Sequence, residues 1–144
     1  MTDYGCFRDS GPLNNLVHLT QLETLSFLFC FGELLPASAK AFPTTLKQLK
    51  LKVNSLSWSY LDIIAELPNL EVLKLITSAF GIEEWYPIVR GFTQLKFLLI
   101  EGNYLKYWKA TNDNFPVLER LVIRSCQNLK EIPIEFADMH TTAD

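Results

Sequence analysis

One hydrophobic pattern recurs five times along the chain at an almost constant spacing. Each copy carries apolar side chains at its first, fourth and sixth positions, and successive copies begin 24, 24, 25 and 23 residues apart. The copies are Leu22-Leu25-Phe27, Leu46-Leu49-Leu51, Leu70-Leu73-Leu75, Leu95-Leu98-Ile100 and Leu118-Leu121-Ile123. Residues two apart lie on one face of a strand. Each copy therefore predicts a short strand with its apolar side buried.

The ninth position of each copy is small and polar or thiol-bearing, and this identifies the repeat. It reads Cys30, Asn54, Ser78, Asn103 and Cys126. Such a side chain hydrogen-bonds the buried backbone where the chain leaves the strand. We therefore predict an α/β leucine-rich-repeat solenoid, a right-handed β-α superhelix of about five repeats. Its concave side is a parallel sheet, and its convex side is irregular or short-helical.

The pattern also divides the chain into segments. Residues 1–11 are expected to form an irregular leader, residues 12–140 the repeat domain and residues 141–144 a tail. We expect strands near 23–28, 47–52, 71–76, 96–101 and 119–124. On the convex side the sequence predicts helices over 57–66 and 82–92 and a loop over 106–114. Neither end resembles a dedicated cap, so we interpret the chain as a piece of a longer array or a truncated relative of one.

Composition and cysteine usage favour one cytoplasmic domain. The 144 residues are 49% hydrophobic, which suits a folded domain. The small net charge of −3 gives the chain no electrostatic attraction to nucleic acid or to acidic membranes. No apolar stretch approaches the roughly 20 residues of a membrane span. Cys30 and Cys126 are four strands apart, roughly 19 Å at about 4.8 Å per strand, which is too far for a disulfide. The chain also has no Asn-x-Ser/Thr site.

Enzyme signatures are absent from the sequence. There is no glycine-rich phosphate loop and no Gly-x-Ser-x-Gly motif, and the two histidines, His18 and His140, lie near opposite ends. We therefore predict a non-enzyme with no catalytic residues, no cofactor, no metal and no small-molecule substrate.

The exposed sheet face is the candidate site. The third, fifth and seventh positions of each repeat alternate with the buried triplet and should face outward. They include an apolar area bordered by basic residues. This area reflects either the strand preference of such side chains or a protein-contact surface. The candidate protein-binding residues are Lys50, Lys52, Val72, Lys74, Ile76, Phe97, Leu99, Glu101, Arg120, Val122 and Arg124.

Charges alternate at the second position of the repeats. It reads Glu23, Lys47, Glu71, Lys96 and Glu119. Opposite charges on adjacent strands are favourable by a few tenths of a kcal/mol per pair. We interpret this ladder as setting strand register rather than binding a ligand.

The fifth repeat resembles a known family. Residues 114–133 read Asn-Phe-Pro-Val-Leu-Glu-Arg-Leu-Val-Ile-Arg-Ser-Cys-Gln-Asn-Leu-Lys-Glu-Ile-Pro. They closely resemble late repeats of plant intracellular nucleotide-binding leucine-rich-repeat receptors, in particular the coiled-coil class of the nightshade family related to late-blight resistance proteins. Residues 67–75 and Trp108-Lys109-Ala110 look similar too. The resemblance covers about residues 12–140 and concerns the repeat domain alone.

This resemblance implies a recognition domain. In that family the repeats sense a pathogen effector directly, or through a guarded host protein, and contact the receptor's own nucleotide-binding domain. The coiled coil and the nucleotide-binding switch of the family have no counterpart in these residues. The main alternative is the substrate-binding repeat domain of an F-box ubiquitin-ligase subunit. That class typically reads Ile-Thr-Asp before a regular helix, whereas Ile132-Pro133 follows the turn here.

Overall fold

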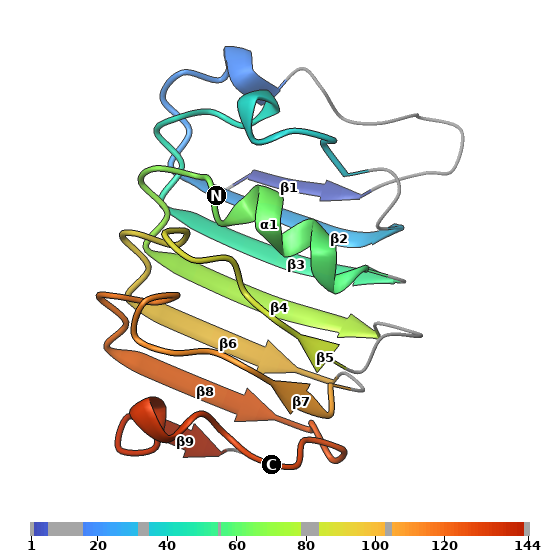
Figure 1. Ribbon diagram of the computed structural model, residues 1–144. Helices are drawn as coiled ribbons and strands as arrows, with labels where there is room; N and C mark the ends of the chain where they lie inside the picture. The colour runs from blue at the N-terminus through green and yellow to red at the C-terminus, as the bar shows by residue number, and fades with distance from the viewer. Residues whose placement is uncertain are drawn as a thin grey trace.

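Parallel strands lie side by side in one sheet of the computed structural model, which describes residues 2–5, 16–31, 35–54, 56–78, 84–102 and 105–142 (Figure 1). Seven strands of this part of the chain pair in the order β1-β2-β3-β4-β6-β8-β9. Their bounds are β1 Thr2–Gly5, β2 Thr24–Phe31, β3 Gln48–Asn54, β4 Val72–Ser78, β6 Phe97–Glu101, β8 Arg120–Arg124 and β9 His140–Thr142. This arrangement is the predicted leucine-rich-repeat solenoid, with little helix.

The strand register matches the sequence repeat. Leu25, Leu49, Leu73, Leu98 and Leu121 are successive cross-strand partners, and the sixth-position residues pair in the same way. All of these side chains are buried in one continuous core. Each of the five repeat strands begins one residue after the expected start. Because the triplet side chains are the buried ones, the inner and outer faces of the sheet are those that the alternation predicts.

The sheet extends beyond the five repeat strands at both ends. β1 pairs in parallel with β2, within the segment expected to be an irregular leader. β9 pairs with β8 and includes two residues of the expected tail. Residues 2–5 of the expected irregular leader thus form a strand, because a sheet edge presents unpaired N–H and C=O groups that an extended segment can satisfy without any repeat pattern.

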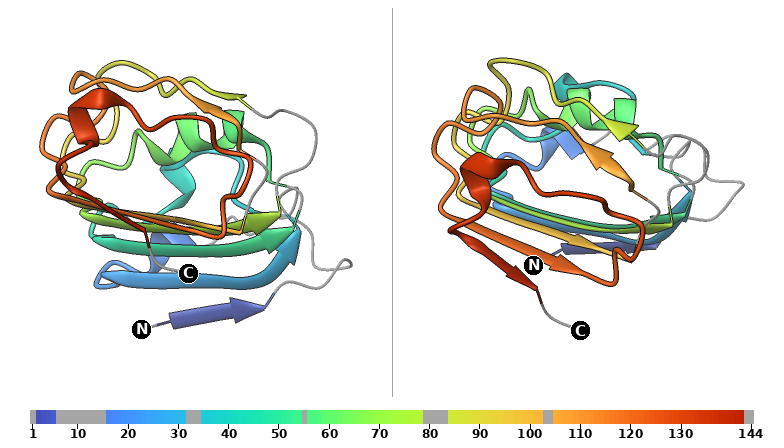
Figure 2. Two further views of the ribbon diagram at one scale, coloured as in Figure 1. Left: turned by 90° about the horizontal axis from the view of Figure 1, so that it is seen from below. Right: turned by 60° about the horizontal axis from the view of Figure 1, so that its bottom comes forward.

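The return segments form a second layer on one side of the sheet (Figure 2). They contain the 3₁₀ turns η2 Leu16–His18, η4 Ala39–Ala41, η5 Trp58–Tyr60 and η6 Ile134–Phe136, and the α-helix α1 Leu61–Ile64. The Ser57 hydroxyl accepts a hydrogen bond from the Ser59 amide and so caps η5. The helix predicted over 57–66 thus exists, in shorter form, as η5 and α1.

The helix predicted over 82–92 was wrong, because the described part from Glu84 onward contains strand β5 Glu84–Trp85 instead. The loop expected over 106–114 is irregular for most of its length, and its two-residue strand β7 Tyr107–Trp108 pairs with β5 in parallel. The register places Trp85 beside Trp108, so burial of these two indoles decides the local backbone conformation.

Aromatic side chains stack along the axis of the solenoid inside the return layer. Ring centroids lie 5.3 Å apart for Trp58 and Trp85, 5.6 Å for Trp85 and Trp108, and 5.6 Å for Trp108 and Phe136. All four side chains are buried. Within the described part of the chain, the three indole N–H groups have no hydrogen-bond partner. Stacking and removal from water therefore hold this aromatic ladder together, rather than polar contacts.

Asn114 joins two neighbouring return segments. Its Nδ2 donates to the carbonyls of Pro87 and Ile88, both at 3.0 Å, and its Oδ1 accepts from the Thr111 amide at 2.8 Å. The side chain is buried, so these bonds satisfy an amide that water does not reach. This contact fixes the distance between successive repeats on the convex side.

Tyr60 makes the stability of the fold sensitive to alkaline pH. Its hydroxyl donates to the Pro36 carbonyl at 2.6 Å, and burial raises its pKa above the ordinary value of 10.0. Above pH 10 the unfolded chain therefore loses this proton before the folded chain does. We expect the free energy of unfolding to fall as pH rises above about 10. Urea unfolding of wild type and Tyr60→Phe between pH 8 and 11 should show a shallower decline for the variant, and equal slopes would contradict this assignment.

Candidate protein-binding face

The open face of the sheet is the face that the return segments do not cover (Figure 2). It carries the third, fifth and seventh repeat positions, as the alternation predicts. Cross-strand neighbours on this face include Val72 beside Phe97, Phe97 beside Arg120, and Glu101 beside Arg124. The parallel register therefore brings the predicted site residues onto one continuous surface.

Two of the predicted contact residues are buried rather than exposed. Leu99 is 6% exposed and Val122 3% exposed, although neither belongs to the core on the other side of the sheet. Both occupy the fifth position, in the middle of their strands. A side chain there is surrounded by neighbours along its own strand and on both adjacent strands, and together these cover it. The expected exposed apolar area is thus smaller than the sequence suggests.

The accessible apolar residues of the predicted set are Val72, Ile76 and Phe97. All three are half-buried, and Phe97 lies under the guanidinium of Arg120, whose carbon is 5.4 Å from the ring centroid. Such a contact is worth about 0.5–1 kcal/mol at an exposed site. We call Val72, Ile76 and Phe97 the apolar strip.

The charged residues of the open face fall into two groups. Towards the C-terminal end, Arg124 pairs with Glu101 at 3.8 Å, and Arg120 covers Phe97. Towards the N-terminal end, Lys50 and Lys74 are direct cross-strand partners and half-buried, and the neighbouring Lys52 is exposed. The basic border predicted from the sequence is therefore present, with its densest part on β3 and β4.

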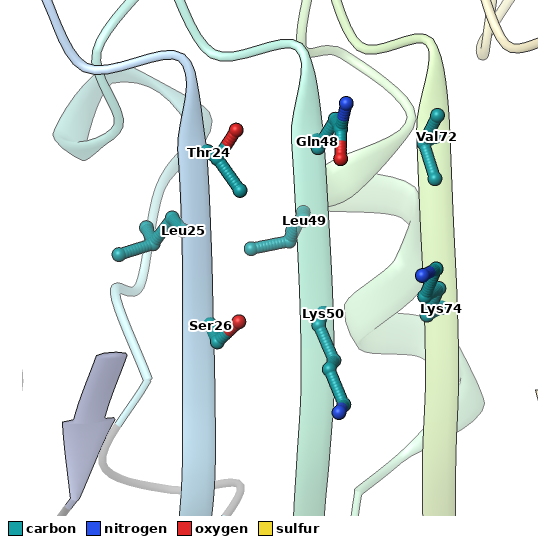
Figure 3. Close-up of a pocket in the computed structure, with 8 residues that line it drawn as sticks. All are labelled: Thr24, Leu25, Ser26, Gln48, Leu49, Lys50, Val72 and Lys74. Atoms are coloured by element: carbon teal, nitrogen blue, oxygen red, sulfur yellow. The ribbon is translucent and has the colours of Figure 1, made fainter. Parts of the chain in front are cut away.

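A small hollow lies between β2, β3 and β4 on this face (Figure 3). Its volume is about 30 Å³. The open-face residues that line it are Thr24, Ser26, Gln48, Lys50, Val72 and Lys74. The sequence-based list included Lys50, Val72 and Lys74 and missed the other three. The signal for Ser26 is its small size at a fifth position where the next two strands, β3 and β4, carry lysine.

The charge ladder lies at the edge where the strands begin. Lys47 pairs with Glu23 at 3.3 Å, and Lys96 with Glu71 at 3.4 Å. The backbone carbonyls of the second-position residues also accept hydrogen bonds from two consecutive amides of the next repeat; Glu71, for example, accepts from Lys96 and Phe97. These exposed ion pairs contribute little energy, but together with the backbone bonds they support the predicted role in register.

The ninth position is only partly described. The Cys126 thiol donates to the Ile100 carbonyl of the preceding repeat at 3.6 Å, as expected for a turn residue. Asn54 differs, because its side chain is exposed. The side chains of Cys30 and Ser78, and all of Asn103, lie outside the described residues.

Two further features concern the described residues as a whole. They contain no group of three or more His, Cys, Asp or Glu side chains placed to hold a metal ion. None of their helices is long and apolar enough to cross a membrane.

An ion pair lies on the return side of the sheet. The Glu131 carboxylate lies 2.9 Å from the Lys109 amine and raises the pKa of that lysine.

Comparison with known proteins identifies relatives. A putative late blight resistance protein homolog of Solanum demissum is 42% identical over 107 residues, which is 69% of this chain and 9% of the relative. This chain is homologous to the late blight resistance proteins of Solanum. A late blight resistance protein of the same species is 45% identical over 96 residues, 65% of this chain and 7% of that protein.

The homology is spread over several members of this group. Another putative late blight resistance protein homolog of Solanum demissum is 38% identical over 109 residues, covering 71% of this chain and 10% of the relative. No protein-family model matches. The chain spans about a tenth of the length of these late blight resistance relatives. The predicted resemblance to late-blight resistance proteins is therefore confirmed, for a repeat segment of such proteins.

Proposed function

We propose that this chain is a non-catalytic protein-recognition module of a plant immune receptor, acting in the cytoplasm. Its partner is a pathogen effector, a guarded host protein or the nucleotide-binding domain of the receptor itself. The proposal assigns it no cofactor, nucleic acid, membrane or small-molecule substrate. The observation that carries this proposal is the homology to late blight resistance proteins over two thirds of the chain.

The open face of the sheet offers a suitable contact surface. It presents the apolar strip next to basic side chains, and a central apolar contact with a polar rim is the usual composition of a protein interface. Phe97 is the best single anchor, because aromatic side chains near arginine dominate the binding energy of many interfaces.

Binding to defined partners tests the proposal. The bait is the full chain, and the probes are the recombinant nucleotide-binding domain of a late blight resistance relative and leaf extract containing pathogen effectors. We expect Phe97→Glu to weaken the bound complex at least tenfold, since it places a carboxylate in an apolar contact. The new carboxylate would face Arg120 across the strands, so the fold should remain intact.

Val89→Glu is the matched control. Val89 is 64% exposed and lies in a return segment, so the same change from apolar to acidic occurs away from the open face. Equal loss of binding in both variants, or no loss in either, would contradict recognition through this face. Recovery of ubiquitin-ligase components instead of immune proteins would favour the F-box alternative.

A further inference from the structure

Ser26 carries a buried hydroxyl. The side chain is 1% exposed, and its Oγ has no hydrogen-bond partner among the residues that the structure describes. It lies on β2 and points toward β3, into the hollow of the open face (Figure 3). An unsatisfied buried hydroxyl costs about 1–3 kcal/mol of desolvation. A polar atom that enters the hollow would satisfy this group and remove that cost.

Two lysines border the same hollow, and neither has a counter-charge among the described side chains. Lys50 and Lys74 are direct cross-strand partners, and Lys50 is also the partner of Ser26. Neither lysine forms an ion pair with another residue in the part of the chain described, whereas Lys47, Lys96 and Lys109 all do. Like charges directly opposite each other in a sheet are destabilising. An anion placed between them would relieve this repulsion.

The hollow suits a small anionic group. A water-sized group needs roughly 10–15 Å³ of such volume, so about 30 Å³ accommodates two heavy atoms. The two oxygens of a carboxylate fit this space. One oxygen would accept from the Ser26 hydroxyl, and the Lys50 and Lys74 side chains on the adjacent strands would supply positive charge at the rim of the hollow.

We propose that this hollow is a carboxylate subsite, which takes one Asp or Glu side chain of the protein partner. The inference rests on the proposed function and names the chemistry of its ligand. Val72 both lines the hollow and belongs to the apolar strip. The partner therefore presents an acidic residue beside an apolar one, the acidic side chain over β2–β4 and the apolar one over β4–β6.

Nuclear magnetic resonance of the lysine side chains tests the subsite directly. The probe is an N-acetylated, C-amidated Ala-Asp-Ala peptide, with Ala-Asn-Ala and inorganic phosphate as comparisons. We expect saturable shifts of the Lys50 and Lys74 Cε–Hε signals with the Asp peptide, and at least tenfold weaker binding of the Asn peptide. Equal binding of the Asp and Asn peptides, or tighter binding of phosphate, would overturn the proposal.

Substitutions separate binding from folding. Lys50→Gln with Lys74→Gln should reduce Asp-peptide affinity at least tenfold, while the charge-matched Lys40→Gln with Lys130→Gln, both at exposed positions, should leave it unchanged. Ser26→Ala should weaken binding severalfold and leave the melting temperature unchanged or higher, because it removes an unsatisfied group. A lower melting temperature together with normal binding would show that Ser26 is structural and would overturn its role.

A carboxylate of this chain, Asp3, is an alternative occupant of the subsite, and one variant tests it. Asp3 of β1 is the register partner of Ser26. If the ligand comes from another protein, Asp3→Asn should leave the lysine signals of the free chain and the peptide affinity unchanged. Shifted lysine signals in the free Asp3→Asn variant would assign the subsite to Asp3 and overturn the proposal.

The same variants distinguish failure of the subsite from failure of the proposed function. If Phe97→Glu weakens a protein partner and the Lys50/Lys74 variant does not, the open face binds proteins but the carboxylate subsite is wrong. If neither variant affects the partner, recognition through this face is wrong as well. Loss of binding in both variants supports the two proposals together.

Discussion

Leu98→Asp is expected to leave the chain unfolded at neutral pH. Leu98 lies on β6 between β4 and β8, and its side chain is 0% exposed. Truncating a buried leucine costs about 2–5 kcal/mol. Keeping the new carboxyl protonated in the core costs several kcal/mol more, at about 1.4 kcal/mol per pKa unit. The sum approaches the roughly 5–15 kcal/mol that stabilises a domain of this size.

The neighbouring residue supplies the control for this experiment. Phe97 faces the opposite side of the same strand, so Phe97→Asp introduces the same charge one residue away, outside the core. Circular dichroism should show a cooperative thermal transition for Phe97→Asp and none for Leu98→Asp. A folded Leu98→Asp with an unfolded Phe97→Asp would mean that the two faces of β6 are reversed.

Trp85→Ala is expected to lower the melting temperature by roughly 10–20 °C. Trp85 is the central member of the aromatic ladder, stacked between Trp58 and Trp108 and in edge contact with Phe92 and Phe115. Replacing a buried tryptophan by alanine costs about 3–5 kcal/mol, through lost burial and the cavity left behind. Each kcal/mol lowers the midpoint by about 2–8 °C in domains of 60–250 residues.

Tyr86→Ala is the matched control for Trp85→Ala. Tyr86 follows Trp85 directly but is 60% exposed, and its hydroxyl hydrogen-bonds the exposed Glu84 carboxylate. We expect its midpoint to stay within a few degrees of wild type. Thermal unfolding followed in the near ultraviolet measures both variants, since the stacked indoles contribute to that signal. Similar midpoints for Trp85→Ala and wild type would show that the ladder does not support the return layer.

The aromatic ladder shows where sequence reasoning stops. Trp58, Trp85, Trp108 and Phe136 lie 12, 15, 13 and 18 residues after the first leucine of their repeats. Because the return segments differ in length, no fixed spacing connects these residues, and the sequence predicted a helix and a loop where β5 and β7 form. Only packing in three dimensions brings the rings together at 5.3–5.6 Å.

The same distinction applies to the candidate site. Alternation along the strands correctly placed Phe97 and Leu98 on opposite faces, because side chains alternate by stereochemistry alone. Exposure is a different property, since it depends on neighbours that are distant in sequence. Leu99 and Val122 are therefore buried on the open face, and Ser26 lines a hollow there that strand alternation alone does not reveal.

By itself, the sequence determined the repeat, the parallel strand register, the buried triplets and the resemblance to late-blight resistance proteins. These depend on local periodicity, which is legible in the order of residues. The tertiary structure decided which edge segments join the sheet as β1 and β9, how the tryptophans stack, and which residues of the open face remain accessible. These outcomes depend on contacts between repeats, and such contacts exist only once neighbouring coils have packed against each other.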